Sequence, residues 1–190
     1  MSRILPDLLS IARVPCAVLF IAIYDGTDRR RFTIALGIIT IALITDFLDG
    51  ALARRLGVSS KHGYILDGLG DRAVYVALFL AFLVQQEIGM VVTWLLVFRE
   101  IAIYAVRLFS GDWFEVSRSV RFMSLLHAGL IRLWILSVLA RHALALYADL
   151  SLEERPSLFL IPHLLLASAL VVSYYSLTRH LSAIVATADF

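Results

Sequence analysis

The chain contains the segment Thr45-Asp46-Phe47-Leu48-Asp49-Gly50-Ala51-Leu52-Ala53-Arg54 and, after eight intervening residues, the segment Gly63-Tyr64-Ile65-Leu66-Asp67-Gly68-Leu69-Gly70-Asp71-Arg72. The first segment ends one long apolar stretch and the second begins the next, so two membrane helices are predicted to carry these aspartates. Spacings of three and four residues place each aspartate pair on one helix face. A charged aspartate costs about 2.5–3.5 kcal/mol at the centre of a membrane span and less near the interface. Because this cost is retained four times, we expect the four carboxylates to serve a functional site.

These carboxylates predict a site for two divalent cations. The short turn from Arg55 to His62 would bring the two pairs face to face at the cytoplasmic rim of the membrane. Clustered carboxylates repel one another unless cations lie between them, and all-oxygen ligands suit Mg²⁺ or Mn²⁺. The alternative is that the aspartates are interfacial residues paired with the neighbouring arginines, Arg54, Arg55 and Arg72.

The composition of the whole chain is that of an integral membrane protein. Of the 190 residues, 61% are hydrophobic and 17% are charged, and the mean hydropathy is +0.87, whereas soluble domains are about 45–50% apolar and about 25% charged. This leaves room for about six spans of roughly 20 residues. We predict an all-α protein of one membrane domain, residues 1–190, with six transmembrane helices at 8–24, 32–53, 64–86, 90–110, 122–147 and 157–178.

The basic residues predict the orientation in the membrane. With the N-terminus inside, most of them fall on the inner side, so the positive-inside rule predicts that both termini and the active site are cytoplasmic. The run from Arg29 to Arg31 opposes this assignment. The net charge of +2 does not indicate nucleic-acid binding, and Cys16, the only cysteine, excludes an intrachain disulfide.

The pattern Asp46-x-x-Asp49-Gly50-x-x-Ala53-Arg54, then eight residues, then Gly63-x-x-x-Asp67-x-x-x-Asp71 resembles the signature of the CDP-alcohol phosphatidyltransferase family at every specified position. The resemblance implies a homodimeric membrane enzyme of phospholipid biosynthesis, in the cell inner membrane, that transfers a phosphatidyl group from CDP-diacylglycerol to an alcohol and releases CMP. It also implies that the four aspartates hold two divalent metal ions and that Asp71 is the general base. The implied nucleotide-binding positions are Gly50, Ala53, Arg54 and Gly63, although such small residues also serve tight helix packing.

The N-terminal segment is similar to one branch of this family, the phosphatidylglycerophosphate synthases. Pro6-Asp7-Leu8-Leu9-Ser10-Ile11-Ala12-Arg13 resembles the Pro-Asn-x-x-Thr-x-x-Arg opening of that branch, which implies nucleotide-binding roles for Ser10 and Arg13. Serine keeps the hydroxyl of threonine. Aspartate in place of asparagine departs from the pattern, and Asp7 also suits a helix N-cap.

Four arginines point to glycerol 3-phosphate as the acceptor. Arg99-Glu100 followed by Arg107 resembles the same branch, and a phosphate pocket is predicted from Arg99, Arg107, Arg118 and Arg121, because guanidinium groups bind phosphate strongly. The segment Ser119-Val120-Arg121-Phe122-Met123-Ser124 stands where that branch has a lysine-rich stretch, and the arginines also suit helix–helix ion pairs. Inositol phosphate and phosphatidylglycerol are therefore alternative acceptors. A divalent-cation transporter is the alternative from another class, although its acidic residues would extend through the whole membrane depth.

Overall fold

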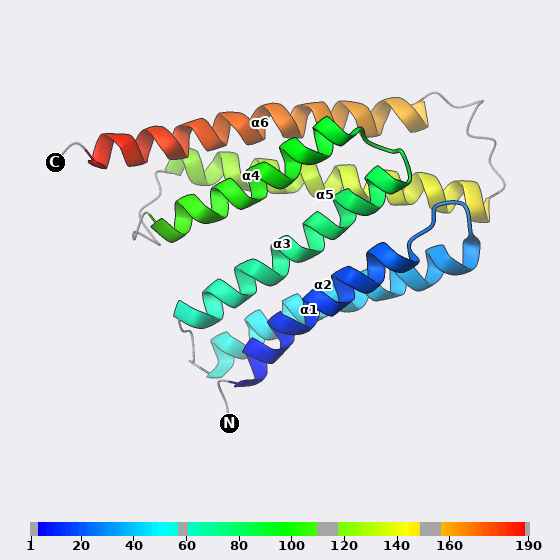
Figure 1. The fold of residues 1–190 in the computed structure, drawn as a ribbon, viewed down its shortest axis with the longest axis horizontal. Helices are drawn as coiled ribbons and strands as arrows, with labels where there is room; N and C mark the ends of the chain where they lie inside the picture. The colour runs from blue at the N-terminus through cyan, green and yellow to red at the C-terminus, as the bar shows by residue number, and fades with distance from the viewer. Residues whose placement is uncertain (1–3, 57–60, 110–117, 149–156, 189–190) are drawn as a thin grey trace. The chain divides into compact units, whose positions relative to one another are not determined.

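The computed structural model describes residues 4–56, 61–109, 118–148 and 157–188, and all the regular structure in these ranges is α-helical. The helices are α1 (Ile4–Ile23), α2 (Arg29–Leu56), α3 (Lys61–Val84), α4 (Met90–Phe109), α5 (Arg118–Tyr147) and α6 (Ser157–Ala188) (Figure 1). The prediction of an all-α chain with six helices is confirmed. The largest difference is at the end of α6, which extends ten residues beyond its predicted end at residue 178, and α2 begins three residues earlier than predicted, within the arginine run.

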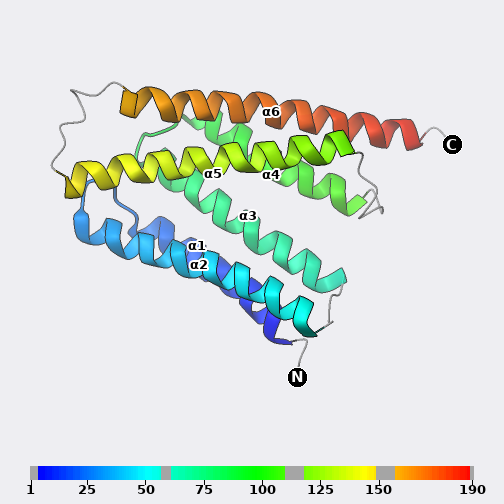
Figure 2. The same ribbon diagram turned by 180° about the vertical axis from the view of Figure 1, so that it is seen from behind.

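The chain divides into two compact units, Met1–Thr93 and Trp94–Phe190. In the first unit, α1 packs against both α2 and α3 (Figures 1 and 2). Because α2 reverses the chain direction, α1 and α3 run parallel to each other. In the second unit, α5 and α6 are antiparallel and pack against each other.

Aromatic side chains hold the three helices of the first unit together near the end of α1. The Tyr24 ring stacks on Phe20 of α1 with centroids 5.0 Å apart, and it lies 6.1 Å from Phe32 of α2 and 5.8 Å from Phe82 of α3. The three phenylalanines have no exposed surface. Aromatic pairs contribute about 0.5–1.5 kcal/mol each beyond their area burial, so Tyr24 fixes the α1–α2 connection against α3.

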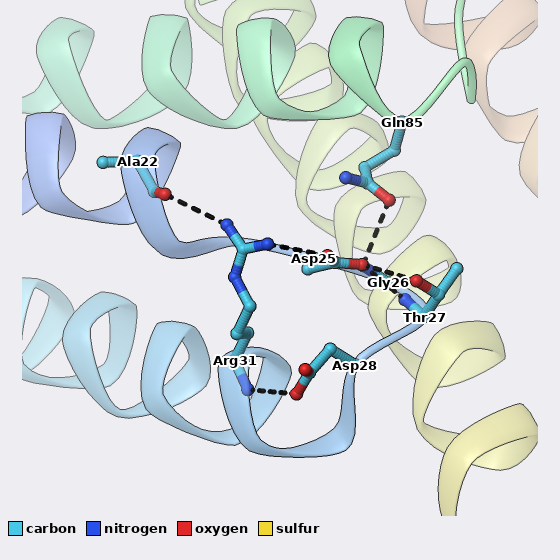
Figure 3. A network of polar contacts seen from close by, with 7 residues as sticks. All are labelled: Ala22, Asp25, Gly26, Thr27, Asp28, Arg31 and Gln85. Carbon is cyan, nitrogen blue, oxygen red and sulfur yellow. Dashed lines mark hydrogen bonds and ion pairs between the residues drawn. The ribbon is translucent and has the colours of Figure 1, made fainter.

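The α1–α2 connection caps both helices that it joins (Figure 3). The Asp28 carboxylate accepts a hydrogen bond from the Arg31 backbone N–H at 2.9 Å, which caps the N-terminus of α2. The Arg31 guanidinium donates to the Asp25 carboxylate at 2.9 Å and to the Ala22 carbonyl near the end of α1 at 3.3 Å. The hydroxyl and backbone N–H of Thr27 donate to Asp25 and, with Arg31, hold the pKa of this carboxyl below its ordinary value of 3.8. Asp28 therefore explains why α2 begins earlier than predicted.

The end of α3 is tied to the same connection. The Gly26 N–H donates to the Gln85 side-chain oxygen at 3.1 Å (Figure 3). Gln86 has a positive φ of 60°, and the Glu87 N–H donates to the Phe82 carbonyl at 2.9 Å, as in a Schellman C-cap. The C-terminus of α3 is thus capped by backbone hydrogen bonds and attached to the α1–α2 connection.

The second unit has a buried apolar seam and an apolar exterior. Ile131, Trp134 and Val138 of α5 are at most 2% exposed, and Ala169 of α6 is fully buried. Among the described residues, two helical stretches, Phe122–Tyr147 and Ser157–Ser182, are long and apolar enough to cross a membrane. Large apolar side chains on these stretches, such as Leu125 at 67% and Val171 at 72% exposure, are mostly uncovered by protein.

Helices α1 and α3 approach each other closely at Gly70. A Cβ atom at this position would lie 2.7 Å from the Ser10 backbone oxygen and 3.3 Å from Arg13 Nε. The first distance is shorter than van der Waals contact allows, and a backbone atom cannot move aside as a flexible side chain does. Glycine at position 70 therefore sets the spacing between the two helices.

We predict that Gly70→Ala lowers the free energy of unfolding by about 1–3 kcal/mol, the usual cost of overpacking, because α1 must move away from α3. Gly37→Ala in α2 is the matched control, since a Cβ there meets nothing within 4 Å. It should be neutral or stabilising by up to about 1 kcal/mol through helix propensity. Thermal unfolding in detergent measures both variants. Equal unfolding temperatures for Gly70→Ala and the wild type would contradict the close approach.

Candidate functional site

The backbone places the two aspartate pairs at matching levels of the first unit. Asp49 precedes Leu56, the last residue of α2, by seven residues, and Asp67 follows Lys61, the first residue of α3, by six. At about 1.5 Å per helical residue, these two positions lie about 10 Å and about 9 Å from the connection between the helices. Since α2 and α3 are antiparallel, Asp46 and Asp71 also lie at similar levels. The side chains of Asp46, Asp49 and Asp67 are outside the described part of the structure.

Of the four aspartates of the predicted metal site, Asp71 is the one whose side chain is described. It forms an ion pair with Arg13 of α1. The Arg13 Nη1 atom donates to Asp71 Oδ1, and Nη2 donates to Ser10 Oγ at 3.2 Å. The Arg13 side chain is 1% exposed and that of Asp71 is 41% exposed. The structure therefore brings together the predicted base, Asp71, and two predicted nucleotide-binding residues, Ser10 and Arg13. One side of the Asp71 carboxyl group is accessible to a reactant.

Arg72 has a backbone partner on its own helix. Its Nη1 atom donates to the Gly68 carbonyl, one turn earlier in α3, at 2.7 Å. The sequence left open whether the aspartates pair with the neighbouring arginines. For Asp71, one arginine that donates to it comes from another helix, 58 positions away in the chain.

The other predicted site residues are placed by their helices alone. The remaining nucleotide-binding positions lie in the last part of α2 and the first turn of α3: Gly50, Ala53, Arg54 and Gly63. Of the acceptor residues, Arg107 lies two residues before the end of α4, Arg118 is the first residue of α5, and Arg121 follows one turn later. The side chains of all of these residues lie outside the described part. Within the described part, no group of three or more His, Cys, Asp or Glu side chains could hold a metal ion.

Arg99, the remaining predicted acceptor residue, belongs to a buried polar cluster of the second unit. Its Nη1 atom donates to Glu100 Oε1 at 2.6 Å, and His127 Nε2 of α5 lies 3.6 Å from the same oxygen. His127 Nδ1 lies 3.2 Å from the Ala169 carbonyl oxygen of α6. The Arg99, Glu100 and His127 side chains are at most 12% exposed. Glu100 thus links α4 to α5, and His127 links α5 to α6.

Sequence reasoning assigned no role to Glu100 or to the polar face of α6. Ser173, Ser176 and His180 are buried at successive turns of that helix. The Ser176 and Ser124 hydroxyls are 3.4 Å apart, and His180 Nδ1 lies 2.8 Å from the Ser176 carbonyl oxygen. Their spacing of three and four residues was a signal in the sequence, but it was hidden among the many apolar residues of the same span.

Comparisons with known proteins identify the family. Residues 3–154 match the model of the CDP-alcohol phosphatidyltransferase family. The chain is 33% identical over 106 residues to a CDP-diacylglycerol--glycerol-3-phosphate 3-phosphatidyltransferase of Pseudomonas fluorescens, covering 54% of each chain. It is 28% identical to a probable phosphatidylglycerophosphate synthase of Mycobacterium tuberculosis (53% of this chain, 48% of the relative). It is 29% identical to a cardiolipin synthase (CMP-forming) of Rattus norvegicus (53% and 33%).

The matched part of these relatives is limited. The chain spans about half the length of the curated relatives that it matches, with 54% and 58% of two such proteins covered. No solved structure matches the chain.

The Glu100 cluster generates a prediction about stability. Glu100→Gln should lower the free energy of unfolding by about 3–5 kcal/mol, because removing one member of a buried ion pair leaves the other charge in an apolar environment. The double variant Arg99→Met/Glu100→Met should lose less than Glu100→Gln alone. Denaturant unfolding in detergent micelles measures both.

A matched control is the exposed ion pair of the first unit. Asp25→Asn removes the partner of Arg31, whose side chain is 49% exposed, and should cost about 1 kcal/mol or less. If Glu100→Gln costs no more than Asp25→Asn, the buried pair does not stabilise the second unit.

Proposed function

Because the chain belongs to the CDP-alcohol phosphatidyltransferase family, we propose that it transfers a phosphatidyl group from CDP-diacylglycerol to glycerol 3-phosphate and releases CMP. The observation that carries this proposal is the pair of matched aspartate levels on α2 and α3, which the family match includes. The names of several relatives, from Pseudomonas fluorescens to Arabidopsis thaliana, support glycerol 3-phosphate as the acceptor. Family membership favours the transferase over the divalent-cation transporter that the carboxylates alone leave open.

The transfer requires a base beside an acceptor hydroxyl. In our proposal, Asp71 takes the proton of that hydroxyl, the acceptor oxygen forms a bond to the phosphatidyl phosphorus, and the pyrophosphate bond to CMP breaks. The 41% exposure of the Asp71 side chain supports this role, because a general base must reach the proton that it abstracts.

The carboxylate set suits two divalent metal ions, Mg²⁺ or Mn²⁺. Asp46, Asp49, Asp67 and Asp71 would hold them, and their oxygen atoms are the ligands that these hard cations prefer. Such ions shield the anionic phosphates and stabilise the leaving CMP. The small residues Gly50, Ala53 and Gly63, with Arg54, would accommodate the nucleotide on the same helix segments.

The phosphate of the acceptor would bind at the connection between α4 and α5. Arg107 lies near the end of α4, and Arg118 and Arg121 lie at the start of α5, which supports a phosphate site formed from these two helix ends. Arg99 lies two turns deeper in α4 and interacts with Glu100. We assign phosphate binding to Arg107, Arg118 and Arg121, and we propose Arg99 as a fourth residue of this group, deeper in α4.

We further propose that the protein is a multi-pass protein of the cell inner membrane, with both termini in the cytoplasm, and a homodimer. Exposed apolar side chains in both units support a lipid environment, including Val18 of the first unit at 61% and Val171 of the second unit at 72% exposure. A cysteine placed at positions 57–60 of a Cys16-free protein should be labelled only after permeabilisation of the cells. Light scattering of the purified protein measures the oligomeric state.

The proposed reaction predicts the acceptor. CMP release from CDP-diacylglycerol should be fastest with glycerol 3-phosphate, compared with inositol 3-phosphate, inositol, serine and phosphatidylglycerol. Arg107→Ala or Arg121→Ala should raise the KM for glycerol 3-phosphate about 10- to 150-fold, since one hydrogen bond between charged groups is worth about 1.5–3 kcal/mol. The KM for CDP-diacylglycerol should change little. Preference for serine or inositol would disprove the glycerol 3-phosphate assignment and leave phosphatidyl transfer intact.

Metal removal tests the carboxylate site. Treatment with EDTA should abolish CMP release, and Mg²⁺ or Mn²⁺ should restore it. Asp46→Asn and Asp67→Asn should weaken the binding of Mn²⁺ measured by calorimetry, whereas Asp28→Asn, at the N-terminus of α2, should not. Full activity of the metal-free enzyme would show that the aspartates have another role.

A further inference from the structure

Arg13 is buried in a position that suits contact with protein groups. The arginine of the N-terminal pattern was expected to bind the nucleotide, and such a residue must present its guanidinium group to the ligand. Here the Arg13 side chain is 1% exposed. Two of its donor atoms, Nη1 and Nη2, face Asp71 Oδ1 and Ser10 Oγ.

The surrounding backbone is built to admit this side chain. At Gly70, a Cβ atom would lie 3.3 Å from Arg13 Nε and 3.4 Å from Arg13 Cζ, so the guanidinium group lies directly over this glycine. Gly70 precedes Asp71 in the chain. The absence of a side chain at position 70 thus allows the arginine of α1 to reach the carboxylate of α3.

From this arrangement we infer that Arg13 is a positioning residue for Asp71. It fixes the orientation of the Asp71 carboxyl group, and Ser10 holds the guanidinium group in place. The inference rests on the proposed function, in which Asp71 removes the proton of the acceptor hydroxyl. It assigns Arg13 to the transfer step in place of nucleotide binding.

The physical reason is that the carboxyl group of an aspartate rotates easily about the χ2 torsion. The χ2 torsion of aspartate is broad and roughly two-fold, so a half-exposed carboxylate rotates unless a hydrogen bond stops it. A charged donor that is itself buried and bound on its other side can stop this rotation. Arginine suits the task better than lysine, because its planar guanidinium group offers donors in a fixed geometry to both Asp71 and Ser10.

The experiment separates positioning from nucleotide binding. In vesicles that contain CDP-diacylglycerol, Arg13→Gln should lower kcat with glycerol 3-phosphate about 10- to 100-fold, as expected when a charge-assisted hydrogen bond to the base is lost. The KM for CDP-diacylglycerol, and its Kd measured without acceptor, should stay within about threefold of the wild type. Arg13→Lys should recover part of kcat, and Ser10→Ala should lower kcat less than Arg13→Gln does.

Arg31→Gln is the matched control, because it removes an exposed arginine–aspartate pair of the same unit, and its kcat should equal that of the wild type. A tenfold or greater rise in the Kd of CDP-diacylglycerol with unchanged kcat in Arg13→Gln would overturn the inference and make Arg13 a nucleotide contact. If Arg13→Gln does not fold, kcat and the Kd of CDP-diacylglycerol are measured for Arg13→Lys and Ser10→Ala instead. Unchanged values of both quantities in both variants would also overturn the inference. Failure of the wild type to release CMP with any acceptor would contradict the proposed function itself.

Discussion

The ion pair between the buried Arg13 and the half-exposed Asp71 constrains the first unit. An isolated charge in an apolar interior costs many kcal/mol, and it is retained only with a partner and further hydrogen bonds. Arg13 meets this condition with the Asp71 carboxylate and the Ser10 hydroxyl. The pair forms only where α1 and α3 approach closely, and this approach requires glycine at position 70. The need to pair the buried charge of Arg13 therefore determines the spacing of α1 and α3 and requires glycine at position 70.

In the second unit, buried charged side chains also lie beside partner groups, but these partners are of other kinds. Glu100 accepts a hydrogen bond from Arg99 and lies beside His127. The guanidinium group of Arg141 in α5, a residue that is 7% exposed, lies 4.8 Å from the centre of the Phe159 ring of α6, a distance that suits a cation–π interaction. Arg99 is therefore buried beside a carboxylate, and Arg141 is buried beside the electron-rich face of an aromatic ring. These polar contacts add to the apolar seam of Ile131, Trp134 and Val138 in fixing the relative positions of the helices of this unit.

The sequence predicted the helices well because each apolar run is long and polar segments separate the runs. It placed the start of α2 too late, because a run of three arginines resembles a loop until the Asp28 cap is seen. The candidate site was predicted in part. Spacing reveals which aspartates share a helix face, but it does not reveal that Arg13 and Asp71, 58 positions apart, are in contact. Gly70 was overlooked for the same reason, since only the path of α1 distinguishes it from the other glycines of α3.

The contacts of α1 also explain why serine suits position 10 of this chain. Helix α1 carries none of the family's aspartates, yet it contacts both helices that carry them. Where the related branch has threonine, this chain has Ser10, and its hydroxyl oxygen accepts a hydrogen bond from the Arg13 guanidinium at 3.2 Å. The methyl group that distinguishes threonine takes no part in that bond. What the structure requires at position 10 is therefore a hydroxyl group one helical turn before the arginine, and serine supplies it.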